Sequence, residues 1–119
     1  MERYLIVVSN INHRRAVTQL RCSTHNLNVE KGRHRGIERS QRFCNCCQNV
    51  LEDEAHFMFV CPLYDDLRRK FLPSYCIDNH VSMLCKMKML FNSTDDNVII
   101  NTSRYIYFAF KRHVLFVTT

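Results

Sequence analysis

The stretch Arg42–Tyr64, RFCNCCQNVLEDEAHFMFVCPLY, contains four residues of the types that bind zinc in proteins. They are Cys44, Cys47, His56 and Cys61, spaced C-x2-C-x8-H-x4-C. Three thiolates and one imidazole complete a tetrahedron around Zn²⁺, and a closed set of four protein ligands is typical of a structural site. The spacing therefore predicts a Cys-Cys-His-Cys knuckle over residues 44–61 that binds one structural zinc ion.

Two other interpretations of this stretch stay open. Cys46 could replace Cys44 or Cys47 as a ligand, although only the Cys44/Cys47 pair has the usual two-residue spacer. The thiols could also be free buried cysteines, which often pack as small hydrophobic side chains. The clustering of four ligand-type residues beside charged neighbours favours metal binding. Outside the knuckle, we expect core thiols at Cys22, Cys76 and Cys85, and a surface or loop position for His25.

The chain has 119 residues, of which 46% are hydrophobic, and this is enough for one domain with a core of its own. A domain of this size gains stability from a staple such as a bound metal. We expect residues 14–43 to form a helix and a basic loop, residues 44–61 the knuckle, and residues 62–117 the C-terminal helices. The predicted fold class is mainly α, with at most a minor β element.

Apolar residues recur at helical spacing in several segments. The first predicted helix spans residues 14–25 with Asn12 as its N-cap, and residues 27–29 are expected to be extended. Asn49 is expected to cap a helix whose first turn holds Glu52–Glu54, because acidic side chains stabilise that end of a helix. The next helix is predicted to end before Pro73. A further helix is expected over residues 81–91 with Asp78 or Asn79 as its cap, and the last helix is expected to begin after Ser93 or Thr94.

The formal net charge of +6 comes from one segment. Residues 14–42 contain eight Lys or Arg and two Glu, so the remaining residues are balanced. A localised excess of this kind attracts polyanions, most commonly nucleic acid, although a solvated basic face would give the same pattern. Gly32 and Gly36 break regular structure and predict a basic loop. The residues expected to contact phosphate are Lys31, Arg33, His34, Arg35, Arg39 and Arg42.

Seven cysteines are an odd number, which argues against a complete disulfide framework. The apolar run at residues 4–8 fits a short strand or the start of a helix, but it is too short for a secretory signal. No apolar stretch approaches the ~18 residues of a membrane span. We therefore expect an intracellular protein, nuclear or cytoplasmic, with reduced thiols and no membrane partner.

No set of residues predicts catalysis. Leu63-Tyr64-Asp65-Asp66 is similar to the aromatic-x-Asp-Asp motif that holds metal ions in polymerases of the reverse-transcriptase type, but Leu63 occupies the aromatic position. Asp65 and Asp66 are instead predicted to be surface charges that pair with Arg68, Arg69 or Lys70. Because four ligands close the zinc site, it has no open position for water, and we expect no enzyme activity.

Six short motifs follow one another between residues 20 and 64. They are Leu20-Arg21, Ser23 to His25, Glu30 to Arg33, Arg42 to Cys47, Glu52 to Phe57 and Cys61 to Tyr64. Together with Tyr105 to Arg112, which looks like a closing helix, they resemble the C-terminal region of animal non-LTR retrotransposon reverse transcriptases. The resemblance covers residues 14–112, and the extra thiol Cys46 departs from it.

The resemblance implies that Cys44, Cys47, His56 and Cys61 are the ligands of a zinc module that contacts RNA or DNA beside a polymerase domain. The polymerase and endonuclease domains of that family have no counterpart here, so the chain is expected to be a separate remnant without polymerase activity. We therefore expect a zinc-dependent module that binds RNA or DNA backbones. The alternative is a structural zinc module whose apolar helices after residue 80 pack against a polymerase domain or another protein partner.

Overall fold

The structure, a computed structural model, describes residues 3–22, 25 and 27–118. The α-helices in these residues are α1 (Tyr4–Val7), α2 (Ile11–Arg21), α3 (Asn28–His34), α4 (Asp65–Phe71), α5 (Met83–Phe91) and α6 (Asp96–Thr118). Between them lie the 3₁₀ turns η1 (Arg39–Gln41), η3 (Pro62–Tyr64) and η4 (Ser74–Cys76) and a π-helix, η2 (His56–Val60). The described residues form no strand, only an isolated antiparallel bridge between Phe43 and Leu51. The prediction of a mainly α fold with a minor β element is confirmed.

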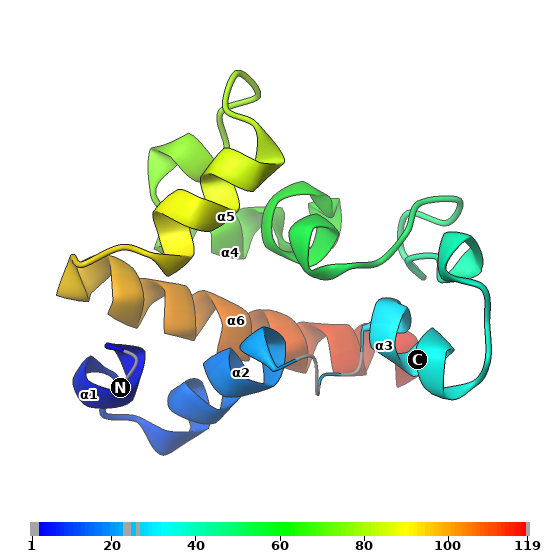
Figure 1. The fold of residues 1–119 in the computed structure, drawn as a ribbon, viewed down its shortest axis with the longest axis horizontal. Helices are drawn as coiled ribbons and strands as arrows, with labels where there is room; N and C mark the ends of the chain where they lie inside the picture. The colour runs from blue at the N-terminus through cyan, green and yellow to red at the C-terminus, as the bar shows by residue number, and fades with distance from the viewer. Residues whose placement is uncertain (1–2, 23–24, 26, 119) are drawn as a thin grey trace.

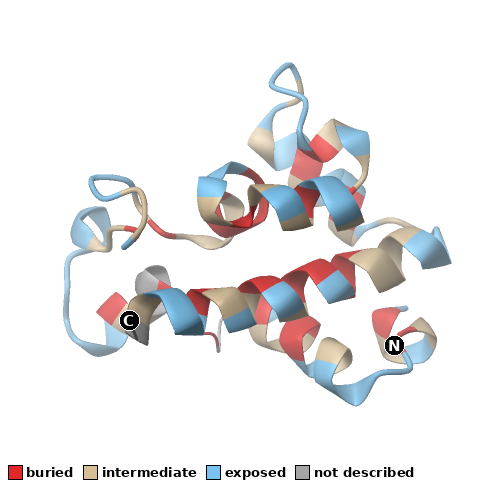
Figure 2. Cartoon of the chain, turned by 180° about the vertical axis from the view of Figure 1, so that it is seen from behind, coloured by how far each residue is buried: buried red, intermediate tan, exposed pale blue. Residues whose placement is uncertain are grey.

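Helix α6 runs through the middle of the fold (Figure 1). α1 and α2 lie on one side of it, α4 and α5 lie on the other, and all four contact it. Its buried residues recur every three or four positions, so α6 is buried along a stripe that packs against its neighbours (Figure 2). These residues are Thr102, Ser103, Tyr105, Ile106, Ala109 and His113. Within the described part of the chain, no helix combines the length and the apolar character needed to cross a bilayer.

The core also packs the candidate metal-binding stretch against α6. Phe57 stacks on Phe110 with ring centroids 4.9 Å apart, and it meets Tyr64 edge-on at 5.0 Å. Other fully buried side chains include Val8, Leu27, Met58 and Ile106. Because Phe57 follows the candidate ligand His56 directly, this packing fixes the ligand's backbone relative to α6.

Among the described α-helices, α2, α5 and α6 begin with a side-chain cap, and none of these three caps is a predicted one. Asn10 Oδ1 accepts hydrogen bonds from the first turn of α2. Ser82 caps α5 and Asp95 caps α6 in the same way. The predicted residues Asn12, Asp78, Asn79, Ser93 and Thr94 lie within a few positions of the true caps.

Other local predictions also need correction. The run at residues 4–8 is helical over Tyr4–Val7, which resolves the choice between strand and helix. The extended segment predicted at 27–29 is wrong, because α3 begins at Asn28. Cys76 is a buried core thiol as predicted, but Cys22 and Cys85 are exposed.

Candidate metal centre

A short looped-back segment carries the first two candidate ligands. Phe43 and Leu51 form the antiparallel bridge, and beside it the Cys44 N–H donates to Val50 O at 2.7 Å. The Glu52 N–H donates to Arg42 O at 2.9 Å and closes the loop. Cys44 and Cys47 therefore lie on a loop whose two ends are hydrogen-bonded to each other.

A tight turn inside this loop brings the two thiols to one side. The Gln48 N–H donates to Cys44 O at 2.8 Å. Gln48 and Asn49 then adopt positive φ values of 55° and 24°, in the left-handed region that Asn tolerates better than most residues. Asn49 is therefore a turn residue, and its predicted role as a helix cap is wrong. Asp53 takes that role, since its Oδ1 accepts from the His56 N–H at 2.8 Å.

The π-helix η2 carries the third candidate ligand, and the fourth follows it directly. His56 is its first residue and Cys61 follows its last. The Cys61 N–H donates to His56 O at 2.9 Å, so one backbone hydrogen bond joins the two ligand residues directly. Single π turns often occur at functional sites, because the wider turn redirects a side chain that an α-helix would place elsewhere.

The two halves bring all four candidate ligands together. The potential ligand atoms of Cys44, Cys47, His56 and Cys61 all lie within 4.8 Å of one another. Cys61 Sγ lies 3.8 Å from both Cys44 Sγ and Cys47 Sγ, and all three cysteines are free thiols. Four ligands at ~2.3 Å from a zinc ion in a tetrahedron would place neighbouring sulfurs about 3.8 Å apart. Cys61 therefore lies at the spacing of a tetrahedral zinc site from both of the other sulfurs.

His56 gives independent evidence that the cluster suits a metal. Its side chain is buried, and among the described residues its Nε2 atom has no hydrogen-bond partner. Leaving a buried polar nitrogen unpaired costs free energy that a metal–nitrogen bond would recover. Cys46 is half-buried but lies outside the group of four, which favours Cys44 and Cys47 over the alternative left open by the sequence.

The thiols of the cluster do not have equal proton affinities. The pKa of Cys44 is lowered, chiefly because the Cys61 thiol hydrogen-bonds to it, although burial acts in the opposite direction. The pKa of Cys61 is raised by its part in the same hydrogen bond and by burial, and burial also raises the pKa of Cys47. Negative charge thus concentrates on Cys44, and a cation among the thiols would stabilise the other thiolates as well.

Arg68 of α4 fixes the end of the π-helix. Its guanidinium is buried, donating from Nε to Met58 O at 2.9 Å and from Nη2 to Cys61 O at 3.0 Å. Tyr105 of α6 adds a hydrogen bond from its hydroxyl to Phe57 O at 2.6 Å. Carbonyl groups at a helix end need such donors when they are buried away from water. The backbone between the ligands His56 and Cys61 is thereby held by both α4 and α6.

Two buried histidines bind the acidic residues that lie between the second and third ligands. His25 Nε2 lies 3.0 Å from Glu54 Oε1, and His113 Nε2 lies 3.1 Å from Glu52 Oε1. The hydrogen bond from His25 lowers the pKa of Glu54, although burial opposes it. The predicted surface position of His25 is wrong, and Glu52 and Glu54 are hydrogen-bonded to buried histidines rather than being simple helix-start charges. The sequence pattern around His113 gives no sign of its bond to Glu52, which is 61 residues away.

The basic residues expected to contact phosphate lie on both sides of a helix end. Lys31, Arg33 and His34 belong to α3, Arg39 belongs to η1, and Arg35 and Arg42 follow these elements. The prediction of a basic loop is therefore wrong for residues 31–34, which are helical, and for Arg39, which lies in η1. It holds for Arg35 and Arg42, which lie outside these elements. Gly36, with φ +70°, lies just after α3, where a left-handed residue favours glycine.

The aspartates of the Leu-Tyr-Asp-Asp stretch lie on α4 and pair with arginines. Asp65 lies 3.4 Å from Arg68 and 3.3 Å from Arg69, as the spacing predicted. Asp66 instead pairs with Arg112 of α6, whose Nη2 donates to Oδ2 at 3.0 Å. Each carboxylate is thus part of an ion pair on the helix surface.

Comparison of the chain with protein-family models, with curated proteins and with solved structures gives no match.

Proposed function

We propose that this protein binds one structural zinc ion through Cys44, Cys47, His56 and Cys61 and uses the neighbouring basic segment to bind the phosphates of RNA or DNA. The observation that carries the proposal is the clustering of the potential ligand atoms of these four side chains within 4.8 Å of one another, with the buried Nε2 atom of His56 left without a hydrogen-bond partner among the described residues. Zinc is the metal that a three-thiol, one-imidazole set selects, because it takes soft sulfur and nitrogen ligands in a tetrahedron. The metal would hold the fold, and residues outside the metal site would contact nucleic acid.

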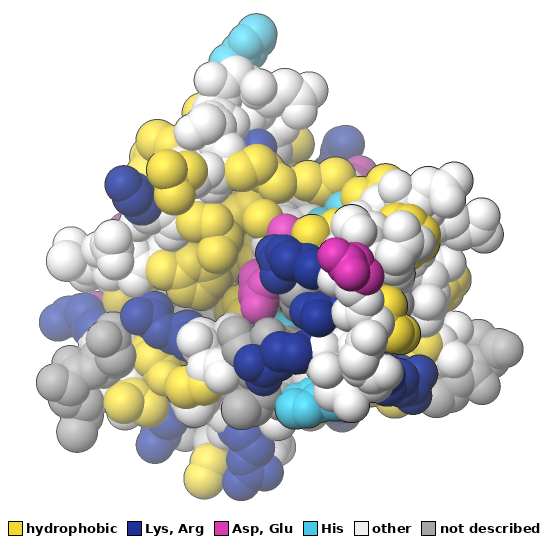
Figure 3. Space-filling view, turned by 45° about the vertical axis from the view of Figure 1, so that its right-hand side comes forward, with side chains coloured by type: hydrophobic (Ala, Val, Ile, Leu, Met, Phe, Trp, Pro, Cys, Tyr) yellow, Lys and Arg dark blue, Asp and Glu magenta, His cyan; other side chains and the backbone are white. Residues whose placement is uncertain are grey.

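A basic cavity supports the second half of the proposal. It lies next to the loop of residues 42–52, which we call the metal loop. It has a volume of about 290 Å³ and is lined by Lys31, Arg35 and Arg42, together with the polar side chains of Gln41 and Asn45. Among the residues that the structure describes, no carboxylate lines it. Basic side chains gather on the face of the molecule in Figure 3, with acidic side chains among them. Lysine and arginine in a concave site suit a phosphate group, because arginine can donate two parallel hydrogen bonds to its oxygens.

The basic cavity is connected to the candidate metal centre by direct contacts. Arg42 accepts a backbone hydrogen bond from Glu52 across the metal loop. The Arg42 side chain packs against Gly32 of α3, and its Nε donates to Ile37 O at 2.9 Å. An ion that closes the loop at Cys44 and Cys47 would therefore also fix the wall of the cavity.

The proposed function also concerns the evolutionary origin of the chain. The succession of motifs from Leu20-Arg21 to Cys61 to Tyr64 supports descent from the C-terminal region of a non-LTR retrotransposon reverse transcriptase, without polymerase activity in the remnant. A genomic search for an upstream polymerase reading frame in register with this chain tests that descent. Absence of any such frame near the gene and its relatives would contradict it.

Metal analysis tests the first half of the proposal. Purified protein should contain one zinc ion, and Cys61→Ser should lose it, since three ligands remain for a site that needs four. Cys46→Ser is the matched control, because Cys46 lies within the same loop but outside the group of four. A protein without bound zinc, or a Cys46→Ser variant that loses it equally, would contradict the assignment.

Binding to RNA and DNA as a function of salt tests the second half. Affinity should fall steeply as salt rises, because phosphate contacts release counterions. Arg35→Ala should weaken binding to every sequence alike, whereas Arg69→Ala, an exposed arginine of α4 away from the cavity, should not. A response that is flat in salt and equal in both variants would overturn nucleic-acid binding.

A chain whose interaction with nucleic acid does not respond to salt or to Arg35→Ala would favour the alternative function, a structural module that packs on a protein partner. Large apolar side chains are exposed on two helices beyond residue 80, including Leu84 at 66% and Leu115 at 67% exposure. Exposed apolar side chains of this size are typical of surfaces that contact other proteins. A chain that binds zinc but no nucleic acid would leave this function as the better explanation.

A further inference from the structure

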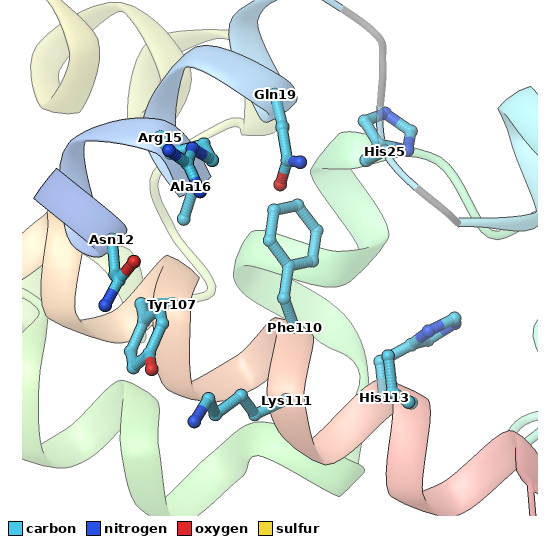
Figure 4. Close-up of a pocket in the computed structure, with 10 residues that line it drawn as sticks. Asn12, Arg15, Ala16, Gln19, His25, Tyr107, Phe110, Lys111 and His113 are labelled. Atoms are coloured by element: carbon cyan, nitrogen blue, oxygen red, sulfur yellow. The ribbon is translucent and has the colours of Figure 1, made fainter.

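A second cavity lies between α2 and α6, on a surface that the proposed phosphate contacts do not use. Its volume is about 290 Å³, and we call it the α2–α6 cavity. Asn12, Arg15 and Gln19 line it from α2, and Tyr107, Phe110 and Lys111 line it from α6 (Figure 4). A cavity of this size, near the lower limit of ~300 Å³ for ligand pockets, suits a ligand of one small unit.

Two basic side chains, Arg15 and Lys111, line this cavity. Arg15 and Lys111 are both exposed, and among the described residues no carboxylate lines the cavity. Histidines 25 and 113 form part of its wall, and they are already bonded to Glu54 and Glu52. A cation from α2 and a cation from α6 in the lining of one cavity suit an anion such as a phosphate.

The cavity also offers aromatic surface. Phe110 is fixed from behind because its ring stacks on Phe57 at 4.9 Å between centroids. The Lys111 ammonium lies over the Tyr107 ring, 4.9 Å from its centroid, so this cation contacts an aromatic side chain of the cavity. Flat aromatic surface next to a cation is the combination that binds a base and its phosphate together.

Side-chain amides complete the lining. Figure 4 shows Asn12 on one side of the cavity and the Gln19 amide directed toward the Phe110 ring. The Asn12 side chain is exposed. An amide offers both donors and an acceptor, which match the mixed donor and acceptor edge of a nucleobase.

We propose that the α2–α6 cavity binds one phosphorylated nucleotide, with the base against Phe110 and Tyr107 and the phosphate between Arg15 and Lys111. The inference extends the proposed nucleic-acid binding to a second site. It does not depend on the metal centre, since none of the four candidate metal ligands lines this cavity. The ligand is a free nucleotide or one nucleotide unit of a single strand, and the two sources share this chemistry.

An NMR titration of the full chain with adenosine monophosphate tests the inference. Backbone amide signals of residues 12–19 and 107–111 should shift. Arg15→Gln and Lys111→Gln should each weaken binding by about tenfold or more, the effect expected when a charged hydrogen bond is lost. Arg104→Gln is the matched control, because Arg104 is an exposed arginine of α6 that does not line the cavity. Adenosine, which lacks the phosphate, should bind at least about tenfold more weakly.

A second arm uses a single strand of deoxythymidines to identify the source of the nucleotide. Shifts of the same signals by the strand assign the site to a nucleotide unit of nucleic acid, and shifts by the mononucleotide alone assign it to a free nucleotide. Equal binding of adenosine and its monophosphate, or equal affinity in Lys111→Gln and Arg104→Gln, would overturn the inference. Arg35→Ala separates the two proposals, because it should weaken strand binding at the basic cavity and leave binding of the monophosphate unchanged.

Discussion

The buried guanidinium of Arg68 donates a hydrogen bond to the backbone carbonyl of Cys61 at 3.0 Å. Cys61 is a candidate metal ligand, so an arginine seven residues further along the chain holds the backbone from which that thiolate projects. The same side chain contacts Met58 O and the Tyr105 hydroxyl, which links α4, the π-helix and α6. The position of the thiol thus depends on a residue that is not itself a ligand.

Replacing Arg68 should therefore destabilise the protein. Arg68→Met would leave carbonyl groups of the π-helix buried without donors, and we expect a loss of about 3 kcal/mol in the free energy of unfolding. Arg69→Met, which removes an exposed arginine that pairs with the carboxylate of Asp65, should cost less than about 0.5 kcal/mol. Urea denaturation at saturating zinc measures both, and similar losses in the two variants would contradict this role.

Removing the metal should loosen the chain around the ligands before it loosens the rest. Backbone hydrogen bonds from the N–H groups of Cys44, Gln48 and Glu52 hold the loop at residues 42–52, and the proposed zinc ion would add a bond to each of its two ligand thiols. A chelator should speed hydrogen exchange at the amides of Cys44, Glu52 and Cys61 more than at the middle of α6. Unchanged exchange at these three amides would show that the loop does not need a metal.

The pair of Glu52 and His113 should be important for stability. Both side chains are 3% exposed, so His113→Ala would leave a buried carboxylate without this partner. We expect a loss of about 3 kcal/mol in the free energy of unfolding. His80→Ala, which removes an exposed histidine of the loop before α5, is the control and should be nearly neutral. Thermal unfolding of both variants measures the difference, and equal midpoints would contradict the expectation.

The pair of Asp66 and Arg112 should make stability depend on pH. The hydrogen bond from Arg112 lowers the pKa of Asp66 below its ordinary value of 3.8. A lowered carboxyl pKa contributes stability that is present above the unfolded pKa and lost as pH falls through the folded one. The free-energy difference between the natural chain and Asp66→Asn should thus be at most about 1 kcal/mol at neutral pH and shrink in acid. A difference that grows in acid would contradict this sign.

Gly32 should matter for nucleic-acid binding through Arg42. A methyl group at Gly32 would lie 2.5 Å from Arg42 Cγ, so Gly32→Ala must displace the Arg42 side chain from the cavity wall. We expect weaker binding to RNA or DNA with helical content and zinc content unchanged. Fluorescence anisotropy measures the affinity, with circular dichroism as the test of folding. Unchanged affinity would place the phosphate contacts elsewhere.

The sequence pattern predicted the four candidate ligands because their spacing is local. All of them lie within residues 44–61, and the turn and the π-helix that orient them are short-range features. The mainly α fold was also predictable, since the helical periodicity of residues 81–91 and of α6 extends over several turns. Helix starts were less certain, because several Asn, Asp and Ser side chains lie near each start and any of them can cap.

The partners of the acidic residues could not be predicted in this way. Glu52 and His113 are 61 residues apart, and Glu54 and His25 are 29 apart, so no local spacing relates them. Arg68 looked like a surface cation from its helical position, because the pattern gives no sign that it turns toward backbone carbonyls. These contacts depend on how α4 and α6 pack, and packing decides them only once the chain is folded.

The closing bond between Arg42 O and the Glu52 N–H has a consequence for the order in which the chain acquires its structure. All four candidate ligands are close in sequence, so bringing them together costs little loop-closure entropy. By contrast, the packing of α2 against α6 joins segments from opposite ends of the chain and must form slowly. We expect the metal loop to form during translation, before α6 has been synthesised. α6 would then pack against a loop that has already formed, through the contacts of His113 with Glu52 and of Tyr105 with Phe57 O.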